Sequence, residues 1–315
     1  MSNQTTNLTI IGAGLWGQAL AKLAKYNDQN NVRIWSRSSS ESLASVVKEA
    51  DVILSAVSMK GVRPTVEKLL ALNIPEETIF ITATKGLETK SILTPSQIWQ
   101  KSFPNHPVVV LSGPNLSKEI DKGLPAATVV ASDDTVAAGK AQEIFSSDIF
   151  RVYFNNDPIG TELGGTLKNV MAIASGVCDG LQLGTNAKSA LLTRALPEMI
   201  RIGNEMGASP ETFFGLSGLG DLIATCDSPL SRNYRVGYGL SEGKTLEQVL
   251  EELQSTAEGV NTANVLVELA RKYRIAIPIS RQVYRLLNGK TTPQEAVQEL
   301  MARDLKAEFD DLDFA

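Results

Sequence analysis

Two lysines occupy positions in the sequence where an ammonium group could take part in a reaction. Lys85 directly follows a short β-rich run, and Lys168 lies within 162–171, a segment with the apolar spacing of a helix. A helical lysine usually extends its ammonium group into water, but positions 170–177 after Lys168 carry no charge at all. The uncharged surroundings make an ordinary surface position less attractive, so Lys168 is a candidate site residue.

A second group of residues has the composition of a phosphate site. The glycine-rich stretch Gly215–Gly220 leads into Asp221, and the run Ser231-Arg232-Asn233 follows. Arginine can bind two phosphate oxygens at once, and serine and asparagine add further donors. Asp221 could hold the Lys168 ammonium in position. A structural alternative stays open for Ser231, because a loop serine is also a common helix N-cap.

The motif Gly12-Ala13-Gly14-Leu15-Trp16-Gly17 has the G-x-G-x-x-G spacing of dinucleotide sites and joins an apolar run to a helix-like segment. In such sites the first glycine permits a tight turn, the second lets a pyrophosphate approach the backbone, and the third lets the helix pack against the strand. The pattern alone is weak, but its place at the start of a βαβ unit favours a bound dinucleotide over a plain turn.

The type of dinucleotide depends on the end of the second β-rich run. NAD sites usually place an acidic residue there, about 20 residues after the glycines, to hold a ribose hydroxyl. This chain has Ser36-Arg37-Ser38 instead, and Arg37 could pair with the 2′-phosphate of NADPH. We therefore expect NADPH or NADH as the cofactor, with NADPH preferred. The alternative is that Arg37 is an ordinary solvated loop residue.

The first half of the chain indicates a doubly wound α/β domain that could position these residues. Short β-rich runs, several of them continuously apolar, alternate with helix-like segments. The β-rich runs are 8–11, 32–35, 51–57, 78–82, 108–111, 128–131 and 151–154. The helix-like segments are 17–25, 41–49, 62–72 and 134–146.

The carboxyl ends of parallel strands are where open sheets bind ligands. Lys85 follows the fourth β-rich run, and Gly113 and Asn115 follow the fifth, so all three are expected at that edge. Pro114 leaves a second interpretation open, in which 112–115 is only a proline-fixed turn.

After Asn155 the pattern changes to helix-like segments with few strand candidates. These segments are 162–176, 187–206, 245–253, 262–271 and 293–302. We therefore expect two domains: a dinucleotide-binding domain over 1–155, and an all-helical substrate and catalytic domain over 156–315.

The composition argues against several kinds of function. The chain of 315 residues has a net charge of −5, so no affinity for nucleic acid is expected. Two cysteines, Cys178 and Cys226, and one histidine, His106, argue against a disulfide framework or a metal site. His106 lies in a turn-like run and is expected at the surface.

The sequence also lacks the signals of export or membrane insertion. No apolar run reaches the ~18 residues of a membrane span, and the N-terminal residues lack a signal-peptide pattern. We expect a cytoplasmic protein that does not insert into membranes. Its oligomeric state is left open, with a homodimer as one alternative.

Taken together, the chain resembles the NAD(P)-dependent glycerol-3-phosphate dehydrogenase family. The resemblance extends over nearly the whole chain and is most specific in 162–180, 186–199 and 215–233. It implies a Rossmann-type N-terminal domain and a helical C-terminal domain. It also implies that dihydroxyacetone phosphate and sn-glycerol 3-phosphate are interconverted by hydride transfer with NAD(P)H, which would supply glycerophospholipid synthesis.

The resemblance assigns roles to individual residues. Lys168 corresponds to the proton donor and acceptor, and no metal is implied. The expected substrate contacts are Lys85, Gly113, Asn115, Asn169, Asp221, Ser231, Arg232 and Asn233. The expected cofactor contacts are Gly12, Gly14, Leu15, Trp16, Gly17, Arg37, Lys85, Ser117, Arg232 and Glu258.

Two other functions and one departure stand beside this resemblance. A β-hydroxyacid dehydrogenase of the same two-domain plan normally places an asparagine one helical turn after its lysine, whereas Asn169 is adjacent to Lys168. A non-catalytic NADP-sensing protein would need no proton donor. The segment between the second and third β-rich runs is shorter than is typical of the family, which bears on the adenosine side of the cofactor site.

Overall fold

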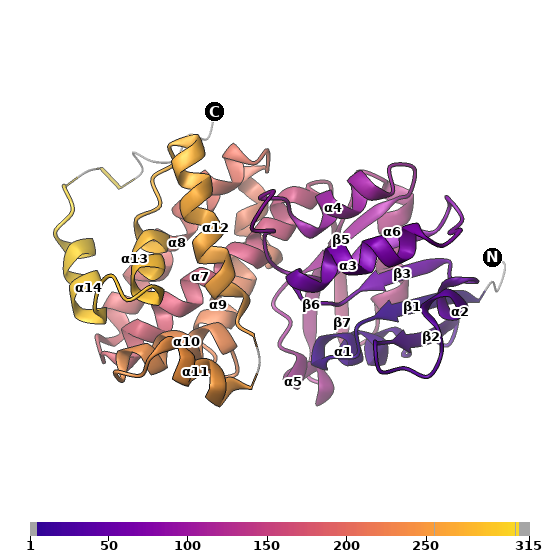
Figure 1. Cartoon of the computed structure of the whole chain (residues 1–315), viewed down its shortest axis with the longest axis horizontal. Helices are drawn as coiled ribbons and strands as arrows, with labels where there is room; N and C mark the ends of the chain where they lie inside the picture. Colours follow the sequence, from indigo (N-terminus) through magenta and orange to yellow (C-terminus); the bar gives the residue numbers. More distant parts are fainter. Residues whose placement is uncertain (1–4, 255, 306, 309–315) are drawn as a thin grey trace. The chain divides into compact units, whose positions relative to one another are not determined.

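The computed structural model describes residues 5–254, 256–305 and 307–308, which form two compact units (Figure 1). The first unit comprises the described residues up to Glu88 together with Leu93–Glu162. The second comprises Thr89–Ile92 together with the described residues from Leu163 onward. The division between the units therefore falls inside one long helix, α7 (Pro158–Gly180).

The first unit is built on a sheet with the strand order β2-β1-β3-β4-β5-β6-β7. Each predicted β-rich run forms one strand. The strands are β1 (Thr6–Ile11), β2 (Asn30–Trp35), β3 (Val52–Ser55), β4 (Ile79–Thr82), β5 (Val108–Ser112), β6 (Ala126–Ala131) and β7 (Phe150–Asn155).

Helices cover both faces of this sheet because the strands bury apolar side chains on both sides. Leu8 and Ile10 of β1 pack with α1, α5 and α6, whereas Ile11 packs with α2, α3 and α4. This alternation follows from the two-residue period of a strand. The helices are α1 (Leu15–Ala24), α2 (Leu43–Val47), α3 (Met59–Leu70), α4 (Pro95–Ser102), α5 (Ser117–Asp121) and α6 (Thr135–Phe145). The doubly wound α/β prediction is confirmed.

One pair of strands departs from the expected parallel arrangement. β5 and β6 pair antiparallel, with Leu111 opposite Val130, while the other neighbouring strands are parallel. The connection contains only α5, and a helix of five residues spans about 7 Å. Such a helix cannot by itself cross the length of a six-residue strand, which is about 20 Å, and the chain instead enters β6 from the end at which it leaves β5, as antiparallel pairing allows.

The second unit is helical throughout the part that the structure describes. Its α-helices are the rest of α7, then α8 (Gly184–Glu205), α9 (Asp221–Cys226), α10 (Arg232–Ser241), α11 (Leu246–Leu253), α12 (Glu258–Tyr273), α13 (Pro278–Leu287) and α14 (Pro293–Met301). A 3-10 turn (Pro210–Phe214) and a π-helical turn (Leu216–Gly220) precede α9. The helix-like segments predicted from 162 onward lie in α7, α8, α11, α12 and α14, whereas α9, α10 and α13 were not predicted.

None of the described helices combines the length and the apolar composition needed to cross a membrane.

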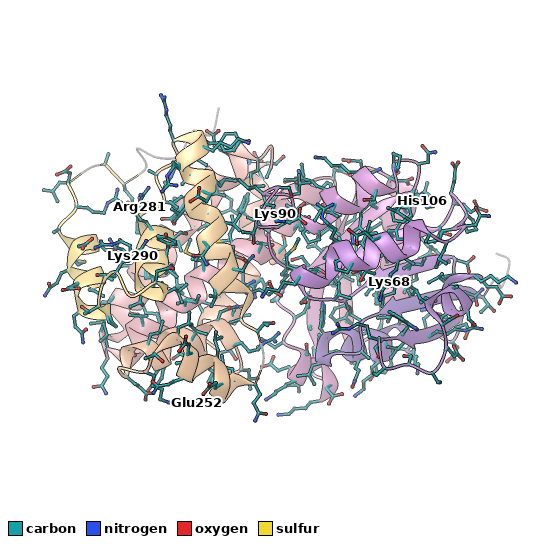
Figure 2. All side chains as sticks on the ribbon, viewed as in Figure 1. Lys68, Lys90, His106, Glu252, Arg281 and Lys290 are labelled. Atoms are coloured by element: carbon teal, nitrogen blue, oxygen red, sulfur yellow. The ribbon has the colours of Figure 1, made fainter. Side chains whose placement is uncertain are left out.

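The prediction that His106 lies at the surface is wrong. The His106 ring, labelled in Figure 2, is 9% exposed, and its centroid lies 5.2 Å from that of Phe80 and 5.3 Å from that of Phe103. The turn-like run therefore packs its one imidazole against Phe80 of β4 and against Phe103 rather than presenting it to solvent.

Candidate active site

The glycine turn after β1 has the geometry that each of its three glycines was expected to supply. Gly12 has a φ of +119°, and a Cβ there would lie 2.7 Å from the Ala56 carbonyl oxygen. Gly17 packs the first turn of α1 onto the loop, since its Cβ would lie 1.9 Å from the Gly12 oxygen. Gly14, by contrast, is exposed, and a Cβ there would meet nothing within 4 Å. The open backbone at Gly14, just before a helix N-terminus, fits a pyrophosphate group.

The two residues between these glycines differ in their contacts. The Leu15 side chain is 70% exposed. The Trp16 indole N–H donates to the Ala83 carbonyl at the end of β4, at 3.3 Å. Trp16 therefore anchors the glycine turn to the strand that leads to Lys85.

The loop after β2 lies next to the glycine turn. The Gly12 N–H donates to the Trp35 carbonyl at 2.8 Å, which joins the two segments directly. Arg37 is exposed two residues later. The Ser36 hydroxyl lies 2.9 Å from that of Ser38, so small polar groups surround the arginine at the place where an adenosine ribose would be bound.

The predicted residues after β4 and β5 meet at the same sheet edge. The Lys85 ammonium donates to the Gly113 carbonyl at 3.3 Å. The Asn115 side-chain amide donates to the Ala127 carbonyl at 3.1 Å, and its oxygen accepts from Thr128 at 2.9 Å. Asn115 is therefore held against β6. Ser117 begins α5 and is half-buried.

In the second unit, Lys168 is buried and paired. Its side chain is 8% exposed, and Nζ lies 3.1 Å from an Asp221 carboxylate oxygen. Nζ also donates to the Thr225 hydroxyl at 2.6 Å, which in turn donates to the same Asp221 oxygen at 3.0 Å. These three residues form a closed triangle, in which Asp221 holds the ammonium as expected. Thr225 was not predicted.

A buried cysteine lies next to this triangle. Cys226 is fully buried at the end of α9, and burial raises the pKa of its thiol to about 12, against an opposing effect of Lys168. The thiol therefore stays protonated at neutral pH and adds no negative charge beside Lys168. It is also no candidate for a nucleophile.

A second polar chain joins Asn169, Asn233 and the start of α12. The Asn233 amide donates to the Asn169 side-chain oxygen at 2.8 Å, and the Asn233 oxygen accepts from the Gly259 N–H at 2.9 Å. Glu258, the first residue of α12, is half-buried next to this contact. Three segments that are far apart in the sequence are thus fixed around one buried amide.

The Ser231-Arg232-Asn233 run forms the start of α10, and part of it has a structural role there. The Ser231 hydroxyl accepts from the Tyr234 N–H at 3.2 Å, so Ser231 is an N-cap. Arg232 is the first residue of the helix and is exposed, whereas Asn233 is 7% exposed. The guanidinium at this helix N-terminus suits an anion, which the helix dipole would also favour.

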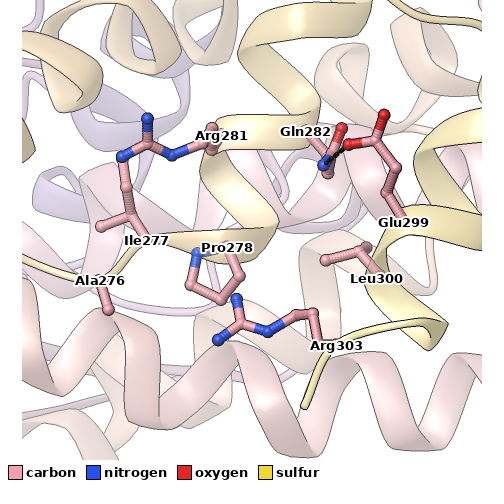
Figure 3. A pocket seen from close by; sticks show the side chains of 8 residues that line it. All are labelled: Ala276, Ile277, Pro278, Arg281, Gln282, Glu299, Leu300 and Arg303. Atoms are coloured by element: carbon pink, nitrogen blue, oxygen red, sulfur yellow. Dashed lines mark hydrogen bonds between the residues drawn. The ribbon is translucent and has the colours of Figure 1, made fainter.

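The predicted residues form two groups, one within each unit. A cavity of about 410 Å³ lies elsewhere, between α13 and the end of α14, and no predicted site residue lines it (Figure 3). Within the described ranges, no three His, Cys, Asp or Glu side chains are grouped so that they could hold a metal ion.

Comparison with known proteins decides the family. The model described as the NAD-dependent glycerol-3-phosphate dehydrogenase C-terminus matches residues 157–298, and its N-terminal counterpart matches residues 38–138. The chain belongs to this family. The membership confirms the predicted resemblance, and with it the prediction of an NAD(P)-dependent enzyme.

Individual members of the glycerol-3-phosphate dehydrogenase family match over almost the whole chain. The glycerol-3-phosphate dehydrogenase (NAD(P)+) of Nostoc sp. is 65% identical over 97% of this chain and 99% of its own length. That of Synechocystis sp. is 62% identical over 97% of this chain and 96% of its own length.

Solved structures support the same assignment. The crystal structure of glycerol-3-phosphate dehydrogenase from Coxiella burnetii has a TM-score of 0.90 and 34% identity, and covers 95% of this chain and 99% of its own. The enzyme from Saccharomyces cerevisiae shares the fold, with a TM-score of 0.81 at 21% identity over 94% of this chain and 99% of its own. The predicted Rossmann-type domain followed by a helical domain is confirmed, and the matches favour this family over the hydroxyacid dehydrogenase and sensing alternatives.

Proposed function

We propose that this protein interconverts dihydroxyacetone phosphate and sn-glycerol 3-phosphate by hydride transfer with NADPH or NADH. Family membership and the names of relatives up to 65% identical support the reaction. The observation that carries it within the structure is the buried triangle of Lys168, Asp221 and Thr225. We assign residues 1–155 to cofactor binding, and 156–315 to substrate binding and catalysis.

The cofactor would be held by the glycine turn and its neighbours. Gly14 offers an open backbone to the pyrophosphate, and Arg37 offers a guanidinium to a 2′-phosphate, which supports a preference for NADPH. When bound, the nicotinamide supplies the hydride. The proposed cofactor contacts remain Gly12, Gly14, Leu15, Trp16, Gly17, Arg37, Lys85, Ser117, Arg232 and Glu258.

In the catalytic step, Lys168 would act on the ketone oxygen of the substrate. As the carbonyl carbon is reduced, negative charge grows on that oxygen, and the Lys168 ammonium would stabilise it by a hydrogen bond and then donate the proton. Asp221 and Thr225 hold the ammonium in one place, so little reorganisation is needed.

The phosphate end of the substrate would be bound by the start of α10. Arg232 is exposed there as a bidentate donor, and Asn233 is fixed by Asn169. Binding energy gained at the phosphate would orient the ketone toward Lys168. The proposed substrate contacts are Lys85, Gly113, Asn115, Asn169, Asp221, Ser231, Arg232 and Asn233, among which Ser231 and Asn115 also have the structural roles described above.

The proposal extends to the pathway, the cellular location and the assembly of the enzyme. Glycerol 3-phosphate would enter glycerophospholipid synthesis, and we place the enzyme in the cytoplasm. A homodimer is the assembly to be tested by light scattering.

The variant Lys168→Ala tests the proposed catalytic role. Loss of a general acid costs roughly 10²- to 10⁴-fold, so kcat with dihydroxyacetone phosphate should fall by at least about 100-fold. NADPH should bind with unchanged Kd, measured by the quenching of tryptophan fluorescence. A kcat close to that of the native enzyme would exclude Lys168 as the proton donor.

A further inference from the structure

A lysine on α8 joins three segments of the second unit. Lys188 Nζ lies 2.7 Å from Asp179, near the end of α7, and 2.9 Å from Asp227, which follows α9. The Tyr234 hydroxyl, in the first turn of α10, donates to the same Asp179 carboxylate at 2.8 Å. These four residues are called the Lys188 brace below.

The brace connects the helices that carry the proposed catalytic residues. Lys168 lies on α7, Asp221 begins α9, and Arg232 begins α10. A further bond, from the Ser175 hydroxyl to the Cys226 carbonyl at 2.8 Å, fastens α7 to α9. Since Lys168 lies on α7, the contacts between α10 and α7 set the distance from Arg232 to Lys168.

The contact between α7 and α10 is made by glycines. A Cβ on Gly176 would lie 2.0 Å from the Tyr234 carbonyl oxygen, and one on Gly237 would lie 1.8 Å from that of Ile173. Backbones in such direct contact have no side chains to interlock along the helix axes. Two side-chain hydrogen bonds supply the directional contact that the glycines cannot give: Asn233 to Asn169, and Tyr234 to Asp179 about three turns further along α7. The second bond holds α10 at a point away from the site, so together the two bonds fix the register of α10 on α7.

The lysine and the tyrosine of the brace keep their protons at working pH. Burial by itself lowers the pKa of Lys188, but its hydrogen bonds to Asp179 and Asp227 outweigh this and raise it above the ordinary value. Burial and the bond to Asp179 raise the pKa of Tyr234 to about 12, so the phenol remains a donor. The brace is therefore a fixed contact rather than a pH switch.

We infer that the Lys188 brace is a positioning device, which sets Arg232 and Asn233 on α10 at a fixed distance from Lys168 on α7. This inference rests on the proposed function, in which Arg232 binds the substrate phosphate and Lys168 serves the ketone. The brace acts at a distance, because Asp179 lies about 16 Å along the helix from Lys168. Its role is to keep the residues that bind the phosphate at the correct distance from Lys168, which acts on the carbonyl group.

The test is Lys188→Met, assayed with dihydroxyacetone phosphate and separately with unphosphorylated dihydroxyacetone. A misplacement of about 1 Å costs up to about 100-fold, so kcat/KM for the phosphorylated substrate should fall about 10- to 100-fold. At saturating NADPH, the value for dihydroxyacetone, which lacks the phosphate that α10 would bind, should change less than about threefold by the same reasoning. Lys188→Arg keeps the charge and should retain most of the activity.

A matched control is available on the same unit. Lys244 also lies between two carboxylates, 2.9 Å from Glu252 (labelled in Figure 2) and 3.6 Å from Glu242. It has no contact of this kind with the start of α10. Lys244→Met should therefore leave the ratio of the two kcat/KM values unchanged.

A second variant guards against a folding defect in Lys188→Met. Tyr234→Phe removes a single hydroxyl and should lower the same ratio several-fold at an unchanged Tm. An equal loss for both substrates, or no change in the ratio in either variant, would overturn the inference.

Failure of the brace can be told apart from failure of the proposed function. If Arg232 binds the phosphate, Arg232→Leu should strongly lower the ratio of kcat/KM for dihydroxyacetone phosphate to kcat/KM for dihydroxyacetone. If Arg232→Leu leaves the ratio unchanged, the proposed phosphate site is wrong, and the inference falls with it. If Arg232→Leu lowers the ratio but Lys188→Met and Tyr234→Phe do not, only the brace is wrong.

Discussion

Arg37 is the first charged residue after the end of β2, where NADH and NADPH sites differ. The neighbouring residues 36 and 38–40 are all serine, so none of them offers a carboxylate to a ribose hydroxyl. The direct bond from the Gly12 N–H to the Trp35 carbonyl keeps this loop beside the glycine turn. A guanidinium in this place adds binding energy only for a cofactor with a 2′-phosphate.

Replacement of Arg37 by alanine should therefore act on one cofactor alone. A hydrogen bond to a charged group contributes about 1.5–3 kcal/mol, so kcat/KM for NADPH should fall roughly 10- to 100-fold while that for NADH stays within about twofold. Arg33→Ala, on the exposed side of β2, is the control and should change neither value. Comparable kcat/KM values for NADH and NADPH in the native enzyme would contradict the role of Arg37.

Thr225 shows why the residues of the candidate site could be predicted only in part. Lys168 and Asp221 were found because charged residues in apolar or glycine-rich surroundings are conspicuous in a sequence. A threonine is not, and its link to Asp221 is an i,i+4 contact that exists only if 221–226 is helical. That six-residue helix is too short to have a recognisable period, so nothing in the sequence connected the two residues.

At the scale of elements, the glycine turn combines two kinds of glycine that can be separated by experiment. Gly17 is required by the fold, because any Cβ would clash with the Gly12 oxygen. Gly14 is not, because its φ is −71° and the surrounding space is open. The structure thus leaves the cofactor as the reason for a glycine at position 14.

Gly14→Ala should weaken cofactor binding without weakening the fold. The substitution fits the backbone, so Tm should change little. The lower entropy of the unfolded chain stabilises the protein by about 0.4–1 kcal/mol, which offsets the poorer N-cap that alanine gives α1. Kd for NADPH should rise at least tenfold, measured by calorimetry. Gly17→Ala is the comparison and should lower Tm by several degrees. Normal NADPH affinity in Gly14→Ala would mean that the cofactor does not approach this backbone.

Two buried glutamates attach the long helices to shorter ones. Glu162 of α7 accepts from the Ser96 N–H at 3.0 Å and from its hydroxyl at 2.5 Å, at the start of α4. Glu198 of α8 accepts from the Ile279 and Ser280 N–H groups, both at 2.8 Å, at the start of α13. Each carboxyl replaces solvent at a helix N-terminus that begins with proline.

Glu162 should make stability depend on pH. Burial raises its pKa to about 7, against the hydrogen bonds from Ser96, whereas the unfolded value is about 4.3. Because the folded pKa is the higher one, its contribution to stability is fully present below the unfolded pKa and is lost as pH rises through about 7.

The measurement is the free energy of unfolding of native enzyme and of Glu162→Gln between pH 5 and 8. The glutamine amide cannot ionise. As pH rises from 5 to 8, the free energy of unfolding of the variant should therefore increase relative to that of the native enzyme by up to about 3 kcal/mol. Parallel pH profiles would show that Glu162 is already ionised in the folded protein.

At the scale of the whole molecule, the strands could be predicted well and the helices unevenly. Parallel strands buried on both faces leave continuous apolar runs, and every such run formed a strand. The helix α10 was missed because it contains Gly237 and Gly239, which are weak helix formers. The structure accounts for Gly237 by its backbone contact with α7, a tertiary requirement that no local pattern expresses.

The same limit applies to the candidate site. Residues 12–17 and 168 could be identified because each motif is local or lies in a conspicuous setting. The pairing of Asn233 with Asn169, and the brace around Lys188, join positions up to 64 residues apart. Those links follow from how the helices pack, which the sequence does not display.

The central claim is that this chain reduces a phosphorylated ketone, and the most direct measurement is the oxidation of NADPH by purified protein. With dihydroxyacetone phosphate, absorbance of the reduced nicotinamide should fall rapidly. With unphosphorylated dihydroxyacetone it should fall far more slowly, because the binding energy of the phosphate end is missing. Equal rates with the two ketones, or no oxidation while NADPH remains bound, would contradict the account.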